Sequence, residues 1–118
     1  MKYLMVLWYD ETEFAAVQQE DAMAVIQRYS EVTDSMRDAG AYVAGEGLTD
    51  SSSATSLSVR DGQRLVSDGP FAETKEQIAG FYLIEADDLD AALAWAEKIP
   101  AAENGSIEIR PVMEYPEG

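Results

Sequence analysis

The stretch YLMVLWY, residues 3–9, is apolar on both of the faces that a β-strand presents. Side chains alternate along a strand, so one face would carry Tyr3, Met5, Leu7 and Tyr9 and the other Leu4, Val6 and Trp8. A strand of this kind is typical of the centre of a sheet that is covered on both sides. We therefore expect residues 3–9 to form a central strand with a packing partner on each face.

A long amphipathic helix is expected after this strand. From Asp21 onward the apolar residues recur every three or four positions, at Ala22, Val25, Ile26, Tyr29, Val32, Met36 and Ala39. This spacing places them on one face of a helix. Gly40 follows the last of them and is a suitable C-terminal cap, because glycine adopts a left-handed backbone at little cost.

Two short segments joined by Asp61-Gly62 predict a β-hairpin. Residues 54–60 alternate between apolar and polar side chains, and residues 63–67 follow directly after the Asp-Gly pair. An Asp-Gly pair between two strands favours a type I′ turn, whose twist suits a hairpin. We expect this hairpin to be an excursion from the main sheet.

The remaining elements complete the fold. Strands are expected at residues 42–48, 78–86 and 107–110, with a helix before the last one that is capped by Asp87 or Asp88 and stopped by Pro100. Without the hairpin, the order is strand, helix, strand, strand, helix, strand. This order predicts one α+β domain over residues 1–118, a ferredoxin-like βαββαβ fold with an extra β-hairpin. Both helices would cover one face of the sheet, and the second apolar face of residues 3–9 predicts a homodimer that packs sheet against sheet.

Charge and hydropathy limit the partners. The net charge is −15, from 23 acidic and 8 basic residues, and the basic residues are scattered along the chain. Such a surface repels phosphate backbones, so we expect neither nucleic acid nor an anionic membrane as a partner.

No stretch approaches the roughly 18 apolar residues that span a bilayer. Because acidic residues follow residues 1–8 directly, we interpret that segment as a strand rather than a signal peptide, and expect a cytoplasmic protein.

The chain contains neither cysteine nor histidine. Disulfides, thiolate metal sites and a cysteine nucleophile are therefore excluded, and any catalyst must use carboxylates, Tyr, Lys, Arg or backbone groups. The carboxylates of Asp50, Asp68, Glu73 and Glu76 lack the alternating spacing of a calcium-binding loop, and no glycine-rich nucleotide loop is present. We expect no metal and no cofactor.

The segment DGPFAETKE, residues 68–76, contains the most unusual cluster of residues. Asp68, Gly69 and Pro70 are typical of a tight turn, and that structural role is the simpler interpretation, with Phe71 as an anchor. The functional interpretation is that the turn holds the carboxylates of Asp68 and Glu73 close together at the mouth of a cleft. These two residues are candidate catalytic groups.

The last strand carries a second set of candidates. If Ile107 and Ile109 face the helices, Glu108 and Arg110 must point to the opposite face, where the dimer would form. A charged pair at that place needs partners. Arg110 could form an ion pair with Glu108 or Glu46 of either subunit, or it could bind an anionic ligand through its planar guanidinium group.

Other candidate ligand-binding residues are Glu46, Phe71, Glu108 and Tyr9. Glu46 lies between Gly45 and Gly47, which would allow a ligand or another backbone to approach closely, or would form a bulge. Three tyrosines, Tyr9, Tyr42 and Tyr82, could line a cleft as apolar walls that carry a hydroxyl group, or could simply pack in the core.

The sequence resembles the YCII-related family, in particular its DGPF branch. The similarity rests on DGPFAETKEQ at residues 68–77, GFYLI at 80–84, GEGL at 45–48, GSIEIRP at 105–111 and the opening MKYL. The resemblance implies a ferredoxin-like subunit that pairs as a dimeric α+β barrel, with a cleft between sheet and loops. Some members of the wider YCII superfamily are thought to act through a His and Asp pair, one of them as a dehydrochlorinase of an aromatic ring. This chain has no His, so that mechanism does not transfer.

Two functional hypotheses follow. In the first, the protein is a cofactor-free enzyme for a small organic molecule, in which Asp68 or Glu73 is the general base and Arg110 orients an anionic group. In the second, the protein is a non-catalytic binding or regulatory module with a regulatory protein as partner. Some DGPF relatives are encoded beside sigma factors, and the absence of His and Cys also favours this second hypothesis.

Overall fold

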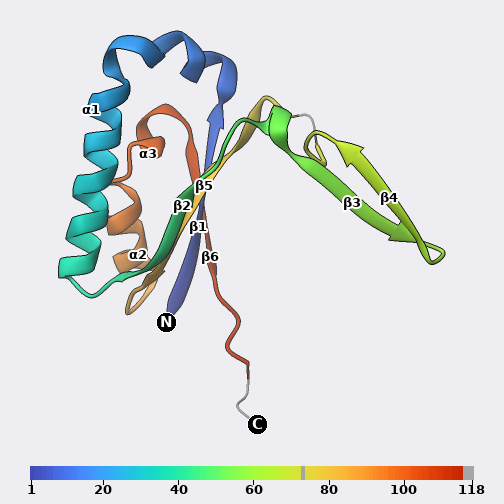
Figure 1. The fold of residues 1–118 in the computed structure, drawn as a ribbon. Helices are drawn as coiled ribbons and strands as arrows, with labels where there is room; N and C mark the ends of the chain where they lie inside the picture. Colours follow the sequence, from blue (N-terminus) through green and yellow to red (C-terminus); the bar gives the residue numbers. More distant parts are fainter. Residues whose placement is uncertain (73, 116–118) are drawn as a thin grey trace.

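The computed structural model describes residues 1–72 and 74–115, and it describes residues 13–21 by their backbone alone. A four-stranded antiparallel sheet, in the order β2-β5-β1-β6, has its helices on one face (Figure 1). The main elements are β1 (Lys2–Asp10), α1 (Glu11–Asp38), β2 (Tyr42–Gly47), β5 (Glu76–Glu85), α2 (Leu89–Ala96), α3 (Ala101–Asn104) and β6 (Ser106–Pro111). This arrangement confirms the α+β, ferredoxin-like fold that the order of elements predicts.

The core lies between the helices and one face of β1. Tyr3, Met5 and Leu7 are buried there together with Ile84 of β5, and Ile109 of β6 packs against them. In the register, Met5 lies opposite both Tyr82 and Ile109, so these side chains share a face. The central position of β1 and the orientation of Ile109 are as the sequence predicts.

The other face of the sheet has no helix over it. Its apolar side chains, which are only half-buried, come from the central strands β1 and β5: Leu4, Val6, Trp8, Phe81 and Leu83. We call this surface the open face. Glu108 and Arg110 of β6 share it, because they lie opposite Val6 and Leu4. One chain therefore covers only one of the two apolar faces of β1.

Helix α1 begins at Glu11, ten residues before the start that the apolar period predicts at Asp21. The N-terminal cap explains the earlier start, because the Oδ1 atom of Asp10 accepts a hydrogen bond of 2.9 Å from the backbone N–H of Thr12. At the other end, Ala41 donates to Met36 and Gly40 donates to Arg37, which is a Schellman motif. The C-terminal cap at Gly40 is thus confirmed.

The second helical region is divided into two helices. Asp88 caps α2 by accepting a bond of 2.9 Å from Ala91, but α2 ends at Ala96, well before Pro100. Pro100 instead stands directly before α3, with φ −53°. The prediction that Pro100 stops the helix is wrong for a physical reason. Proline has no backbone N–H to donate inside a helix, but the first N–H groups of a helix have no intrahelical acceptor, so proline is well suited to a helix start. No helix among the described residues is long and apolar enough to cross a membrane.

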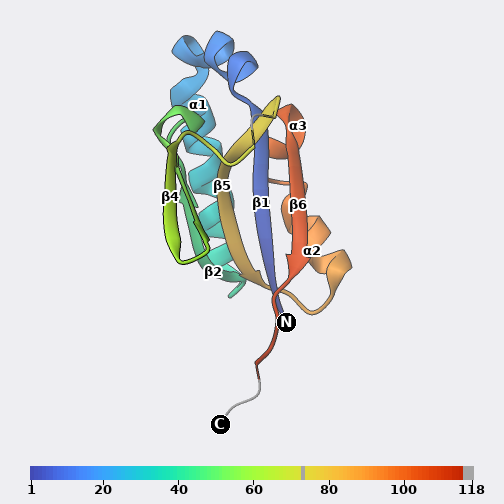
Figure 2. The same cartoon turned by 90° about the vertical axis from the view of Figure 1, so that its right-hand side faces the viewer.

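The hairpin consists of β3 (Thr55–Arg60) and β4 (Gln63–Asp68), which pair with each other in a separate two-stranded sheet. A short turn of 3-10 helix, η1 (Ser51–Ser53), precedes it. Asp61 and Gly62 both have positive φ, 52° and 75°, as a type I′ turn requires. We call residues 55–68 the arm. Figures 1 and 2 show that it projects on the side of the sheet opposite to the helices.

Candidate functional site

A cavity of about 570 Å³ lies on the helix side of the sheet, between α1 and strands β1, β2 and β5. Four tyrosines supply much of its wall: Tyr9 from β1, Tyr29 from α1, Tyr42 from β2 and Tyr82 from β5. Thr33, one turn after Tyr29 on α1, completes this side. We call this cavity the tyrosine pocket.

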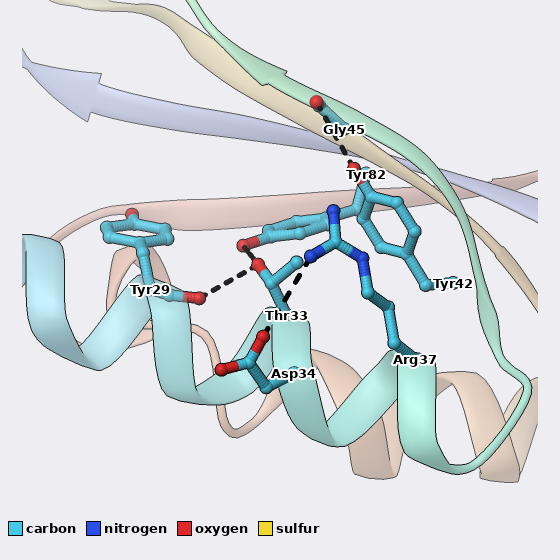
Figure 3. Close-up of polar contacts among 7 residues, drawn as sticks. All are labelled: Tyr29, Thr33, Asp34, Arg37, Tyr42, Gly45 and Tyr82. Atoms are coloured by element: carbon cyan, nitrogen blue, oxygen red, sulfur yellow. Dashed lines mark hydrogen bonds and ion pairs between the residues drawn. The ribbon is translucent and has the colours of Figure 1, made fainter.

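The polar groups of the pocket are already connected to one another. The hydroxyl of Thr33 donates to the backbone carbonyl of Tyr29 at 2.8 Å and lies 2.9 Å from the hydroxyl of Tyr82 (Figure 3). Because the single proton of Thr33 is used in the first bond, Tyr82 is the donor in the second. The ring of Tyr42 packs edge-on against that of Tyr82, with centroids 6.4 Å apart. The wall between α1 and the sheet is therefore ordered before any ligand binds.

The phenol groups of Tyr9, Tyr29 and Tyr82 stay protonated at neutral pH, because the pKa of each is raised. Burial raises the pKa of Tyr29 to about 12, and the nearby Tyr82 adds to the shift. Burial also raises the pKa of Tyr82. For Tyr9, burial and then the negative charges of Glu11 and Asp50 raise the pKa. The protonated phenols of these three tyrosines are poor general bases near neutrality.

Glycines determine the shape of the pocket on the sheet side. A Cβ atom at Gly45 would lie 2.9 Å from the ring of Tyr82, and one at Gly80 would lie 2.5 Å from the carbonyl oxygen of Glu46. Side chains at these positions would push apart the ring and the two strands. A Cβ at Gly47, in contrast, meets nothing within 4 Å. Gly45 and Gly80 thus serve close packing, while Gly47 borders open space in the pocket.

Two of the predicted ligand-binding residues, Tyr9 and Glu46, line this pocket. The register places Glu46 opposite Phe81, so its carboxylate points toward the open face even though the residue borders the pocket. Tyr29 and Thr33 are not among the predicted site residues. The sequence feature that could have identified them is their spacing. Thr33 follows Tyr29 by one helical turn, and both lie beside the apolar positions of α1.

Glu108 and Arg110 lie on the open face, on the other side of the sheet from the pocket. The Nε atom of Arg110 donates to Glu108 at 2.5 Å, and the guanidinium group is exposed. The ion pair that the sequence suggests is thus formed within one chain. An exposed pair of this kind contributes little stability, typically about 0–1 kcal/mol.

The turn at residues 68–71 lies at the base of the arm. Asp68 is the last residue of β4, Gly69 donates to Ala54 at 2.7 Å, and the carbonyl of Gly69 accepts from the hydroxyl of Ser56 at 2.8 Å. Phe71 is 90% exposed, so it does not anchor the turn in the core of the described residues, contrary to the role expected from the sequence. Glu73 lies outside the described residues. Asp68 is therefore on the arm, whereas Arg110 is on β6, the edge strand farthest from β2.

A second, smaller and more open hollow of about 490 Å³ lies beside the open face, next to Trp8, Asp10 and residues 74–76. Lys75 contributes to it, and it is the only basic residue among the described residues that line either cavity. Among the described residues, no group of three or more His, Cys, Asp or Glu side chains could hold a metal ion.

Comparison with known proteins places the whole chain in one family. A protein from Rhizobium meliloti (strain 1021), itself uncharacterised, is 37% identical over 120 residues, which cover all of this chain and 97% of that protein. The family model of the YCII-related domain matches residues 1–116. The narrower assignment to the DGPF branch stays a prediction. The chain belongs to the YCII-related family.

Proposed function

We propose that this protein binds a small organic molecule in the tyrosine pocket. The observation that carries the proposal is the cavity itself, whose volume of about 570 Å³ lies in the range typical of small-molecule sites. Its walls combine aromatic rings with a small number of hydroxyl groups, which is the usual composition of such sites. An aromatic or otherwise flat apolar body suits the rings of Tyr29 and Tyr82.

The charges around the pocket favour a neutral or cationic ligand over an anion. Glu11 and Asp50 lie close enough to Tyr9 to raise its pKa, and none of the described lining residues is Lys or Arg. Arg37 lies 4.7 Å from the ring centroid of Tyr42, and its charge is offset by Asp34 at 3.9 Å. Tyrosine rings also attract organic cations directly.

Binding is better supported than catalysis. The phenols of Tyr29 and Tyr82 hold their protons firmly, and a general base for the pocket would have to come from a carboxylate. The hypothesis of a cofactor-free enzyme, with Asp68, Glu73 and Arg110 as catalytic groups and Phe71 and Glu108 at the ligand, stays a prediction. A ligand-binding protein also fits the alternative of a regulatory module, because a bound small molecule is a common input to regulation.

We further propose that the protein is a homodimer that packs through the open face. Leu4, Val6, Trp8, Phe81 and Leu83 form an apolar surface that one chain leaves half-exposed. Apolar patches of this kind mark interaction sites on soluble proteins. A second copy offers the same surface, and a two-fold axis would bury both together.

Three aromatic probes of equal size but different charge test the binding proposal: 2-naphthylmethylamine, 2-naphthylmethanol and 2-naphthoate. Binding is followed by the shifts of backbone amide NMR signals. We expect the amine and the alcohol to shift the amides of Thr33, Gly45 and Ala79, and 2-naphthoate to bind at least about tenfold more weakly. Failure of all three probes to shift these amides would contradict the proposal. Tight binding of 2-naphthoate would contradict only the charge preference.

A blocking variant supplies the control. Leucine at position 47 would project into open space without a backbone clash, so Gly47→Leu should fill part of the pocket and abolish binding of the amine. Ser52→Leu, at an exposed position outside the pocket, is the matched control and should bind as the natural protein does.

A further inference from the structure

The arm carries apolar side chains that its own chain does not cover. Leu57 and Val66 lie directly opposite each other and are 60% and 53% exposed. Val59 lies two residues from Leu57 and so on the same face of the hairpin, and it is also exposed. These three side chains form an apolar strip on one face of the arm.

The arm has little to stabilise it within one chain. Among the described strands, β3 and β4 pair only with each other, and an isolated two-stranded hairpin is at best marginally stable in water. The radius of gyration is 16.4 Å, against about 13.5 Å for a compact chain of this length. The arm, which projects away from the body in Figure 1, contributes to this excess.

The turn at residues 68–71 fixes the base of the arm. The bonds from Gly69 to Ala54 and from Ser56 to Gly69 join the two ends of the hairpin where it leaves the body. Phe71, at 90% exposure, stands just beyond this base. The arm projects from the body, is held at its base and has an exposed phenylalanine beside that base. It is therefore suited to contact a surface outside its own chain.

The charge of the arm favours a second copy of this chain as the partner. In a protein with net charge −15, residues 55–68 contain two arginines, Arg60 and Arg64, and two aspartates, Asp61 and Asp68, so the arm is neutral. On the open face, Arg110 pairs with Glu108, while the carboxylate of Glu46 points to the same face. The neutral arm, with its two arginines, can therefore meet the open face of a second acidic copy without strong repulsion.

We propose that the arm of each subunit docks at the edge of the open face of a second copy, beside the sheet-to-sheet contact, with the strip of Leu57, Val59 and Val66 and the ring of Phe71 as its apolar contacts. The contact is reciprocal, because each chain offers both an arm and an open face, and a two-fold axis closes the pair. This inference rests on the proposed homodimer and adds a role for the turn at residues 68–71, which is to position the arm.

Analytical ultracentrifugation tests the proposal. The double variant Leu57→Ser with Val66→Ser, and separately Phe71→Ala, should raise the dimer dissociation constant by at least about tenfold. The control is Met23→Ser with Ile26→Ser, which changes two exposed apolar residues on α1. This control should leave the constant unchanged. None of the substituted residues belongs to the core formed by the described residues, so circular dichroism should show every variant folded.

The outcomes separate the two proposals. If the natural protein is a monomer at its highest soluble concentration, both the homodimer and the docked arm are wrong. If it is a dimer and the arm variants dissociate no more readily than the α1 control, the docked arm is wrong and the sheet-to-sheet dimer stands. Hydrogen exchange gives an independent reading, because amides of β3 and β4 should become more protected as the dimer forms. Exchange that is independent of protein concentration across dimer formation would overturn the docked arm.

Discussion

The hydroxyl of Tyr82 lies 2.9 Å from the hydroxyl of Thr33 and joins the centre of the sheet to the middle of α1 across the pocket. Tyr82 is buried, and Thr33 passes the connection on to the carbonyl of Tyr29. The bond thus fixes the distance between helix and sheet at the place where the pocket begins. Its loss should affect both stability and ligand binding.

Replacement of Thr33 by valine, which has almost the same shape, should lower the free energy of unfolding by about 1–2 kcal/mol, because the buried hydroxyl of Tyr82 loses its acceptor. Tyr82→Phe should cost less, because Thr33 keeps its bond to the carbonyl of Tyr29. The double variant should cost clearly less than the sum of the two, since Tyr82→Phe removes the hydroxyl that Thr33→Val leaves without an acceptor. Urea denaturation of all four proteins measures this, and strictly additive losses would mean that the bond does not couple helix to sheet.

The buried phenol of Tyr29 predicts a loss of stability in alkaline solution. Its pKa is about 12 in the folded protein, against 10.0 for an exposed tyrosine. The folded state therefore holds this proton more tightly, and the contribution is fully present below pH 10.0 and is lost as the pH rises toward about 12. In Tyr29→Phe, the free energy of unfolding should fall less steeply over this window. Equal slopes in the two proteins would contradict the raised pKa.

Local patterns were sufficient to predict most of the fold. The Asp-Gly pair at residues 61–62, the cap at Gly40 and the alternation in residues 3–9 each act over a few neighbouring residues, and all three are found as expected. The start of α1 was missed because the apolar period begins only near Asp21, although the cap at Asp10 with Glu11 in the first turn marks the helix start. The apolar period alone was a misleading guide there.

The pocket was harder to predict than the fold. Its walls come from four elements far apart in the sequence, and only the register of β1, β2 and β5 brings Tyr9, Tyr42 and Tyr82 to the same face. The sequence drew attention to the unusual turn at Asp68 and to the charges on β6. Unusual composition indicates where the backbone or a charge needs a special environment. In this chain the turn at Asp68 belongs to the arm, and the charges on β6 belong to the open face.

Neither Asp68 nor Arg110 lines the tyrosine pocket, so substitutions there should leave ligand binding intact. We expect Asp68→Asn and Arg110→Met to bind 2-naphthylmethylamine within about twofold of the natural protein, because charges at exposed, distant sites are screened by solvent. NMR titration of the three proteins checks this. A loss of binding in either variant would place the ligand near these residues and revive their predicted role as catalytic groups.

Gly45 and Gly47 provide a matched pair, because they lie on the same strand and differ in what a side chain would meet. At position 45 a methyl group would lie 2.9 Å from the ring of Tyr82, so Gly45→Ala should lower the free energy of unfolding by about 1–3 kcal/mol through overpacking. At position 47 nothing lies within 4 Å, so Gly47→Ala should change it by less than about 0.5 kcal/mol. Urea denaturation compares the two. If the variants are equally stable, the ring of Tyr82 is free to move away from β2, and the pocket wall is less rigid than its hydrogen bonds imply.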